Sequence, residues 1–328
     1  VVACRCWFAA STISTKTRMM RWIATGQVRL MFILLVVAVR GRELVCPHDA
    51  IAQNSGGVRD LGYFFSPQNY DEVTHGRRTS ATAKSSIRIN LQYVDTSELT
   101  TAKDDFLRNT LLPAAVSWID GSLSVVPVAG NLLFEPFCSS TFPTKCAAAT
   151  NPTCGSYTVP DSMLAAIETC TSCTTSGVCS GCTTSAAGTG LASTDFVLFV
   201  SAVTTSSCGT VTSSGYSGIL AYAATCQRDQ YDRPIMGHAN FCPDALDPGA
   251  SAWNEQKATA VHELLHALGF SSGSWPLFRN ADGTAQTARG SDGLPAMVPT
   301  ACTDGVTRNS LEVNSSTLSV VTERGHLV

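Results

Sequence analysis

The sequence predicts an α/β protein whose mixed, twisted sheet packs against one helix that carries a metal-binding pattern. Strand-like apolar segments and segments of helical period alternate before residue 270, an order typical of α/β folds. His262, Glu263 and His266 form a His-Glu-x-x-His pattern in the last helical segment. A Ser/Thr-rich stretch at 138–190 holds seven cysteines and interrupts this order. We therefore expect an α/β domain with a cysteine-rich insertion.

The expected elements follow in chain order. Residues 87–94 (IRINLQYV) alternate apolar and polar, as a half-buried strand does. Residues 101–119 have helical spacing, and Pro113 inside them is expected to kink or divide the helix. A strand is expected at 122–128. The continuous apolar run at 195–203 predicts a buried strand, and the shorter run at 218–224 predicts a strand at the sheet edge.

The cysteine-rich stretch at 138–190 contains two Cys-x-x-Cys pairs. They are Cys170 with Cys173, and Cys179 with Cys182. Only five residues separate the pairs, whereas a zinc ribbon separates them by about fifteen to twenty. We therefore expect a surface insertion held by disulfides, which an oxidising compartment permits.

The N-terminus and the charge distribution indicate an exported protein. Ten apolar residues at 30–39 follow Arg18, Arg21 and Arg29, the size and charge order of a secretory signal. From residue 44 onward, 15 basic residues stand against 24 acidic ones. An acidic body without a basic patch argues against nucleic acid as a partner. We expect a secreted or cell-surface protein with a leader at 1–43, of which 1–18 precede the first methionine and need not be translated.

The patterned helix has the residues of a zinc site. His262 and His266 lie one turn apart (~6 Å) on one helix face, so both imidazoles can reach one Zn²⁺ at ~2.0–2.1 Å. Glu263 can act as a general base on a metal-bound water. Gly269 stands where a helix favours its C-terminal glycine. An apolar stripe beside the histidine face is expected to bury the helix, formed by Ala258, Val261, Leu265 and Leu268.

A catalytic zinc needs a third protein ligand, and the sequence leaves its identity open. The compact form of the zinc-protease motif would place a histidine at position 272, where Ser272 stands. A glutamate on a following helix is the second arrangement, but Asp282, Asp292 and Glu312 lie in stretches without helical period. The third arrangement has a long insertion before the last histidine.

The third arrangement is that of a known family. The segment His262-Glu-Leu-Leu-His266-Ala-Leu-Gly-Phe-Ser271, with the strand-like segments at 195–203 and 218–227, resembles the leishmanolysin family of metzincin zinc proteases. Cys46-Pro-His-Asp49 is similar to the family's pro-region cysteine motif. The resemblance covers about residues 45–325 and implies a metzincin-like catalytic domain that is made as a zymogen.

The resemblance assigns roles to particular residues. It implies that His262 and His266 bind one Zn²⁺ per chain, that Glu263 is the catalytic base, and that Cys46 occupies the zinc in the latent form. Disulfide pairing is the alternative for Cys46. The family's third histidine precedes an aromatic residue, which His326 does not, so His326 is a weak candidate. We expect the third ligand beyond residue 328, in a chain truncated before it.

These inferences define a hypothesis and an alternative. Residues 44–84 are expected to be a pro-segment, 85–270 the N-terminal catalytic subdomain, and 271–328 the start of the next subdomain. The hypothesis is a secreted or cell-surface zinc metalloendopeptidase acting on proteins or peptides, for which membrane-surface association stays open. The alternative is a catalytically inactive relative that serves as an adhesion or binding module. The sequence does not specify an oligomeric state.

Overall fold

The computed structural model describes residues 84–142, 145–212, 215–280, 282–290, 293–301, 307–314, 317, 322–323 and 326–327. The expected leader and pro-segment, with Cys46, lie outside these residues, and the predictions about them stay predictions.

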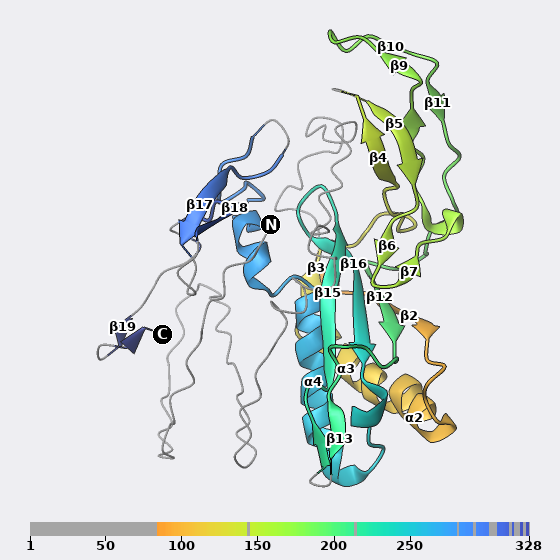
Figure 1. Ribbon diagram of the computed structural model, residues 1–328, viewed down its shortest axis with the longest axis vertical. Coiled ribbons are helices and arrows are strands. Elements are labelled where there is room, and N and C mark those ends of the chain that lie inside the picture. The colour runs from red at the N-terminus through yellow and green to blue at the C-terminus, as the bar shows by residue number, and fades with distance from the viewer. Residues whose placement is uncertain are drawn as a thin grey trace.

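A four-stranded sheet forms the centre of the described structure (Figure 1). Its strands, in spatial order, are β15 (Ala221–Arg228), β16 (Pro234–Phe241), β12 (Phe196–Ser201) and β2 (Ile89–Asp95). β12 runs parallel to both β2 and β16, whereas β15 is antiparallel to β16 at one edge. Every residue of β12 and β16 is buried, as expected for strands covered on both faces. The predicted mixed sheet, its buried strand and its edge strand are confirmed.

The first long helix is continuous but changes its winding in the middle. It consists of α2 (Thr101–Phe106), a π-helical segment η2 (Leu107–Leu111) and α3 (Leu112–Asp120). Pro113 lacks the N–H that would bond the carbonyl four residues earlier, and the wider π turn ends two residues before it, at Leu111. The expected disturbance at Pro113 is therefore confirmed as a change of winding.

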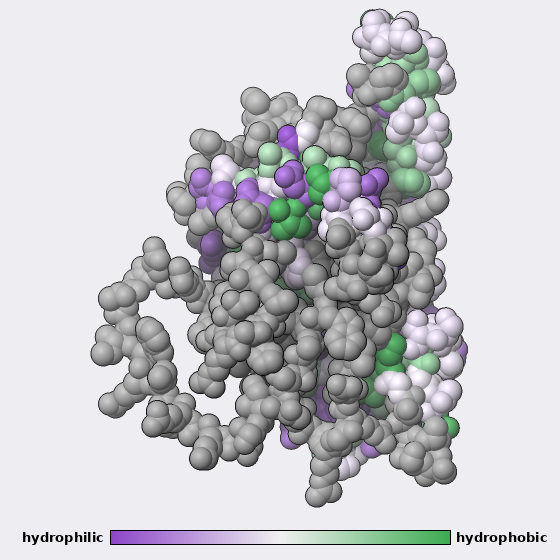
Figure 2. Space-filling model, turned by 60° about the vertical axis from the view of Figure 1, so that its left-hand side comes forward, coloured by the Kyte–Doolittle hydropathy of each residue, from purple (hydrophilic) through white to green (hydrophobic). Residues whose placement is uncertain are grey.

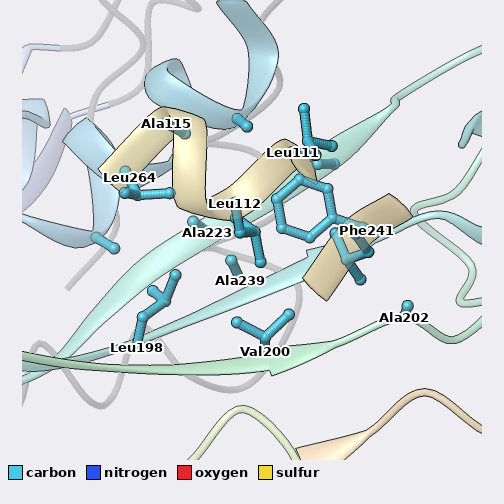
Figure 3. Packing of buried hydrophobic residues seen from close by; sticks show 14 of the residues in the cluster. Leu111, Leu112, Ala115, Leu198, Val200, Ala202, Ala223, Ala239, Phe241 and Leu264 are labelled. Atoms are coloured by element: carbon cyan, nitrogen blue, oxygen red, sulfur yellow. The ribbon is translucent and has the colours of Figure 1, made fainter. Parts of the chain in front are cut away.

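The main core lies between the sheet and its helices. α2, α3 and α4 (Trp253–Ala267) contribute to one apolar cluster on this face of the sheet. Figure 3 shows side chains of this cluster that meet there, from η2, α3 and α4 and from β12, β15, β16 and the residue after β12: Leu111, Leu112, Ala115, Leu198, Val200, Ala202, Ala223, Ala239, Phe241 and Leu264. Burial of each of the larger side chains in this cluster stabilises the folded state by about 1.5–3 kcal/mol.

The cysteine-rich insertion covers part of the opposite face of the sheet. Val159 of this segment and Phe134, which precedes it, are fully buried in one cluster with Val197, Phe199 and Met236. The insertion is built from short strands: β4 (Phe137–Thr141), β5 (Cys146–Thr150), β6 (Thr153–Cys154), β7 (Tyr157–Thr158), β8 (Glu168–Thr169), β9 (Ser172–Cys173), β10 (Cys179–Ser180) and β11 (Thr183–Thr184). In Figure 2 its outer end shows mostly pale, intermediate hydropathy colours, which agrees with its Ser/Thr/Ala composition.

Disulfides staple this insertion, as predicted. The described residues form the pairs Cys138–Cys146, Cys154–Cys226, Cys170–Cys182, Cys173–Cys179 and Cys208–Cys242. Cys154–Cys226 joins the insertion to the edge strand β15 across 72 residues of sequence. The insertion was expected to be only a surface segment. This is correct for its outer end, but its base contributes Cys154 and Val159 to the apolar cluster on the sheet face opposite the helices.

The remaining elements are short. The strand expected at 122–128 is reduced to β3 (Ser124–Val125), which pairs with β1 (Ser85–Ser86). The others are η3 (Asp161–Met163), β13 (Thr210–Thr212), β14 (Gly215–Ser217), η4 (Pro243–Ala245), η5 (Ala250–Ala252), η6 (Ser272–Leu277), β17 (Met297–Ala301), β18 (Thr307–Leu311), β19 (Thr322–Glu323) and β20 (His326–Leu327). Within the described ranges, no helix is both long and apolar enough to cross a membrane.

Candidate metal centre

The helix α4 carries the His-Glu-x-x-His residues and packs on β15 and β16. Its buried apolar side chains are Ala260, Leu264 and Ala267. Gly237 of β16 permits this close packing, because a Cβ atom there would lie 3.0 Å from the Cβ of Ala267. The helix ends at Ala267, and Gly269 turns the chain with a φ of +93°. The predicted helix and its glycine are therefore present.

The predicted apolar stripe of this helix is wrong in register. Ala258 is exposed, and Val261, Leu265 and Leu268 are only partly buried at the border of the core. The sheet facing the helix is lined by alanine and glycine, so it accepts small alanine side chains at close range. The prediction from hydrophobicity favoured the larger side chains Val261, Leu265 and Leu268. The residues buried in the structure each lie one position earlier in the sequence.

The two histidines converge on one point. The Nε2 atoms of His262 and His266 lie 2.9 Å apart, and the ring planes are nearly perpendicular at 89°. The Nδ1 atom of His266 lies 2.8 Å from the carbonyl oxygen of Phe270. A carbonyl only accepts, so Nδ1 carries the proton, and Nε2 of neutral His266 carries the lone pair that can bind a metal.

Glu263 lies beside this pair in a dry environment. Its side chain is buried (6% exposed), and its Oε2 atom has no hydrogen-bond partner. Burial raises the pKa of the Glu263 carboxyl to about 8, while a hydrogen bond from the Ala223 N–H opposes the rise. Burial also lowers the pKa of His262, which favours the neutral imidazole that binds metals.

This donor set fits a zinc ion. Two nitrogens bound tetrahedrally to zinc lie about 3.3 Å apart, so the rings need to open by only a few tenths of an ångström from 2.9 Å. The unpartnered carboxylate oxygen of Glu263 is the kind of buried acceptor that a nearby cation or water satisfies. The Phe270 carbonyl and the Ala223 N–H were missed by sequence reasoning, because backbone atoms leave no residue signature.

The third ligand remains a prediction. Among the residues that the structure describes, no other His, Cys, Asp or Glu completes a three-donor set with His262 and His266. The three-donor group found in that part, Cys170 with Cys173 and Cys179, consists of disulfide-bonded cysteines. His326 lies in β20 opposite Glu323, and its side chain is outside the described part. Cys46 also lies outside it.

Comparisons with known proteins find similarity to one family of peptidases. Residues 166–322 match the family described as Leishmanolysin. The chain is 34% identical to a leishmanolysin-like peptidase of Drosophila melanogaster over 232 residues, which are 67% of this chain and 32% of the relative. It is 34% identical to the Caenorhabditis elegans leishmanolysin-like peptidase over 64% of this chain and 32% of the relative. The ciliated left-right organizer metallopeptidase of Mus musculus is 37% identical over 93 residues, 28% of this chain and 13% of the relative.

The chain thus spans about a third of the length of the curated leishmanolysin-like relatives that it matches. The matched segment contains the disulfide-bonded end of the insertion, the sheet strands β12, β15 and β16, and the whole of α4. On these matches, the chain belongs to the leishmanolysin family of metallopeptidases.

Proposed function

We propose that the protein is a zinc-dependent metalloendopeptidase that hydrolyses peptide bonds in proteins, is secreted or displayed at the cell surface, and is made as a zymogen. The observation that supports this most is the convergence of two Nε2 atoms to 2.9 Å beside the buried carboxylate of Glu263. A purely structural helix has no need for a buried carboxyl group with one unpaired oxygen atom, because the desolvation of that atom is unfavourable.

The roles of the residues follow from their positions. When bound, zinc supplies a Lewis acid that polarises the scissile carbonyl and acidifies a water molecule. His262 and His266 hold the metal through Nε2, and the Phe270 carbonyl fixes the orientation of His266. Glu263 accepts the proton of the attacking water and delivers it to the leaving amine. Burial brings its pKa in the metal-free protein to about 8, close to neutral pH, where one group can both accept and release a proton.

The edge strand β15 offers a place for the substrate. Within the described part of the chain, β15 pairs with β16 on one side and has no strand partner on the other. Ala223 of this strand bonds Glu263 through its N–H, so the strand borders the proposed catalytic base. An extended peptide can add to such an edge by main-chain hydrogen bonds.

A pair of matched variants tests the function. Glu263→Gln is expected to keep zinc binding and to lose peptide hydrolysis by at least about 100-fold, since general base catalysis contributes about 10²–10⁴-fold. Glu255→Gln, in the exposed first turn of the same helix, should leave the hydrolysis rate unchanged. Equal rates in wild type and Glu263→Gln would refute the proposed base.

The alternative function has its own signature. Two results together would favour a binding module. The wild-type chain would bind zinc no more tightly than a variant with both His262→Ala and His266→Ala, and it would hydrolyse no member of a peptide library. For the proposed zymogen, Cys46→Ser in the full chain should raise the hydrolysis rate before any removal of residues 44–84.

A further inference from the structure

The Nδ1 atom of His266 lies 2.8 Å from a backbone atom, the Phe270 carbonyl oxygen, and this hydrogen bond orients the ring. This atom lies in the turn that follows α4. The turn is held at its beginning by backbone hydrogen bonds, with Phe270 N–H donating to Leu265 O at 3.0 Å and Ser271 N–H donating to Gly269 O at 2.9 Å. Movement of this turn would release the His266 ring, so whatever braces the turn also positions the proposed metal ligand.

One side of the turn borders a pocket that is partly open to solvent. A cavity of about 130 Å³ lies against it, lined by Gly269, Phe270, Ser274, Leu277 and Phe278 of the turn and by Arg228, Asp232 and Pro234 of the β15–β16 hairpin. Apolar contacts across a cavity are weak, because its lining atoms lack neighbours. Fixed hydrogen bonds across it therefore matter more than they would in a close-packed core.

Arg228 makes these bonds. It is the last residue of β15, and its Nη2 donates to the hydroxyl of Ser274 at 2.7 Å. Its Nη1 donates to the carbonyl oxygen of Asp232 at 2.9 Å. The Ser274 side chain is buried, and its backbone N–H donates to Ser271 O at 3.0 Å. One planar guanidinium thus joins the sheet hairpin to the segment that follows the metal helix.

The far side of this link is itself fixed. Asp232 has a left-handed φ of +62°, and its carboxylate Oδ2 accepts from Arg279 Nε at 2.8 Å and from Arg289 Nη2 at 3.1 Å. The Asp232 side chain is almost fully buried, at 3% exposed. Ion pairs in this setting resist movement more than surface pairs do, because they are little screened. The Asp232 carbonyl is thus a rigid anchor for Arg228.

We propose that Arg228 is a positioning residue for the metal ligand His266: it holds Ser274, and through the turn the Phe270 carbonyl, in the place that orients the imidazole. This proposal rests on the proposed zinc function. It predicts that loss of the Arg228–Ser274 bond weakens zinc binding beyond any effect on the fold. Partners that orient a metal ligand commonly contribute 10–100-fold to metal affinity.

The test is a zinc titration of the purified full chain by calorimetry. Arg228→Lys keeps the charge but loses the rigid fork that reaches both acceptors. Ser274→Ala removes the hydroxyl that accepts from Arg228 and that also lies 3.2 Å from the Ser271 hydroxyl within the turn. Both variants are expected to raise the zinc Kd about 10-fold or more. The matched control is Arg233→Lys in the same hairpin, because Arg233 bonds Val126 O and pairs with Asp229 instead of the turn. It should change the Kd less than about 2-fold.

A second readout needs no metal. In the zinc-free protein, ¹⁵N NMR of the imidazoles should show His266 as the Nδ1–H tautomer in wild type and Arg233→Lys. In Arg228→Lys and Ser274→Ala, a second tautomer should gain population, since the acceptor is no longer fixed. If Arg228→Lys does not fold, Ser274→Ala decides alone.

The possible failures can be told apart. The positioning role is refuted if Ser274→Ala, and also Arg228→Lys where that variant folds, changes the zinc Kd and the tautomer population no more than Arg233→Lys does. In that case zinc binding itself still stands. If His262→Ala leaves the wild-type zinc Kd unchanged, the proposed metal site itself fails, and the positioning role with it.

Discussion

The buried histidine in the middle of the sheet should make the fold acid-sensitive. His238 of β16 lies on the sheet face opposite α4, and its Nε2 is 2.9 Å from the hydroxyl of Ser201. That hydroxyl donates its proton to Asn240 Oδ1 at 2.7 Å, so it can only accept from Nε2–H. Gly155 lies against the imidazole ring, where a Cβ atom would come within 2.7 Å of Cγ, Cδ2 and Nδ1. His238 is only 8% exposed, so an imidazolium there would be poorly solvated.

The magnitude follows from the pKa of His238. Burial lowers it from 6.5 to about 4. Between these two values the unfolded chain binds a proton that the folded chain does not, so stability is full above about pH 6.5 and falls as the pH decreases towards 4. The difference between these two pKa values corresponds to a loss of about 3 kcal/mol in the free energy of unfolding at low pH. At a pH of about 4.5 the expected loss is about 2–3 kcal/mol.

The assay is urea unfolding of wild type and of His238→Gln at a pH of about 7.5 and about 4.5. Glutamine does not titrate, so the carboxylates shared by both proteins cancel in the comparison. Between a pH of about 7.5 and about 4.5, the free energy of unfolding should decrease by about 2–3 kcal/mol more in wild type than in the variant. Losses that agree within about 0.5 kcal/mol would show that His238 is not held neutral by the fold, and an NMR titration of the ring would then give a pKa near 6.5.

Three further changes probe other parts of the structure. Gly269→Ala places a side chain at a φ of +93° and 2.9 Å from Pro234 Cγ, so it should lower the free energy of unfolding by at least about 1–2 kcal/mol and raise the zinc Kd, measured by unfolding and titration. Leu264→Ala empties a fully buried position and should cost about 2–5 kcal/mol in urea unfolding; a loss below about 1 kcal/mol would contradict the packing of α4. Replacing both Cys154 and Cys226 by alanine opens a 72-residue loop and should cost about 2–5 kcal/mol by the same measurement, whereas unchanged stability would show that this disulfide does not hold the insertion to the sheet.

Local chemistry along the chain determines several features directly. The continuous apolar run of β12 has the composition of a strand buried on both faces, and the structure places it there. Pro113 disturbs its helix because a missing N–H acts within one turn. His262, Glu263 and His266 share a helix whose end is set by Gly269. These features depend on neighbours within a few residues, so the sequence reveals them.

Tertiary contacts decide the rest. The register of α4 on the sheet depends on Gly237, which lies in another element and allows Ala267 to approach. Disulfide connectivity likewise depends on distances between distant segments, as Cys154 and Cys226 show. The orientation of His266 depends on a backbone carbonyl, and the turn that carries it is tied by Arg228 to a hairpin some forty residues earlier. Spacing in the sequence places two imidazoles on one helix face, but only the packed structure determines where their nitrogens point, because that direction is set by groups that approach from other elements.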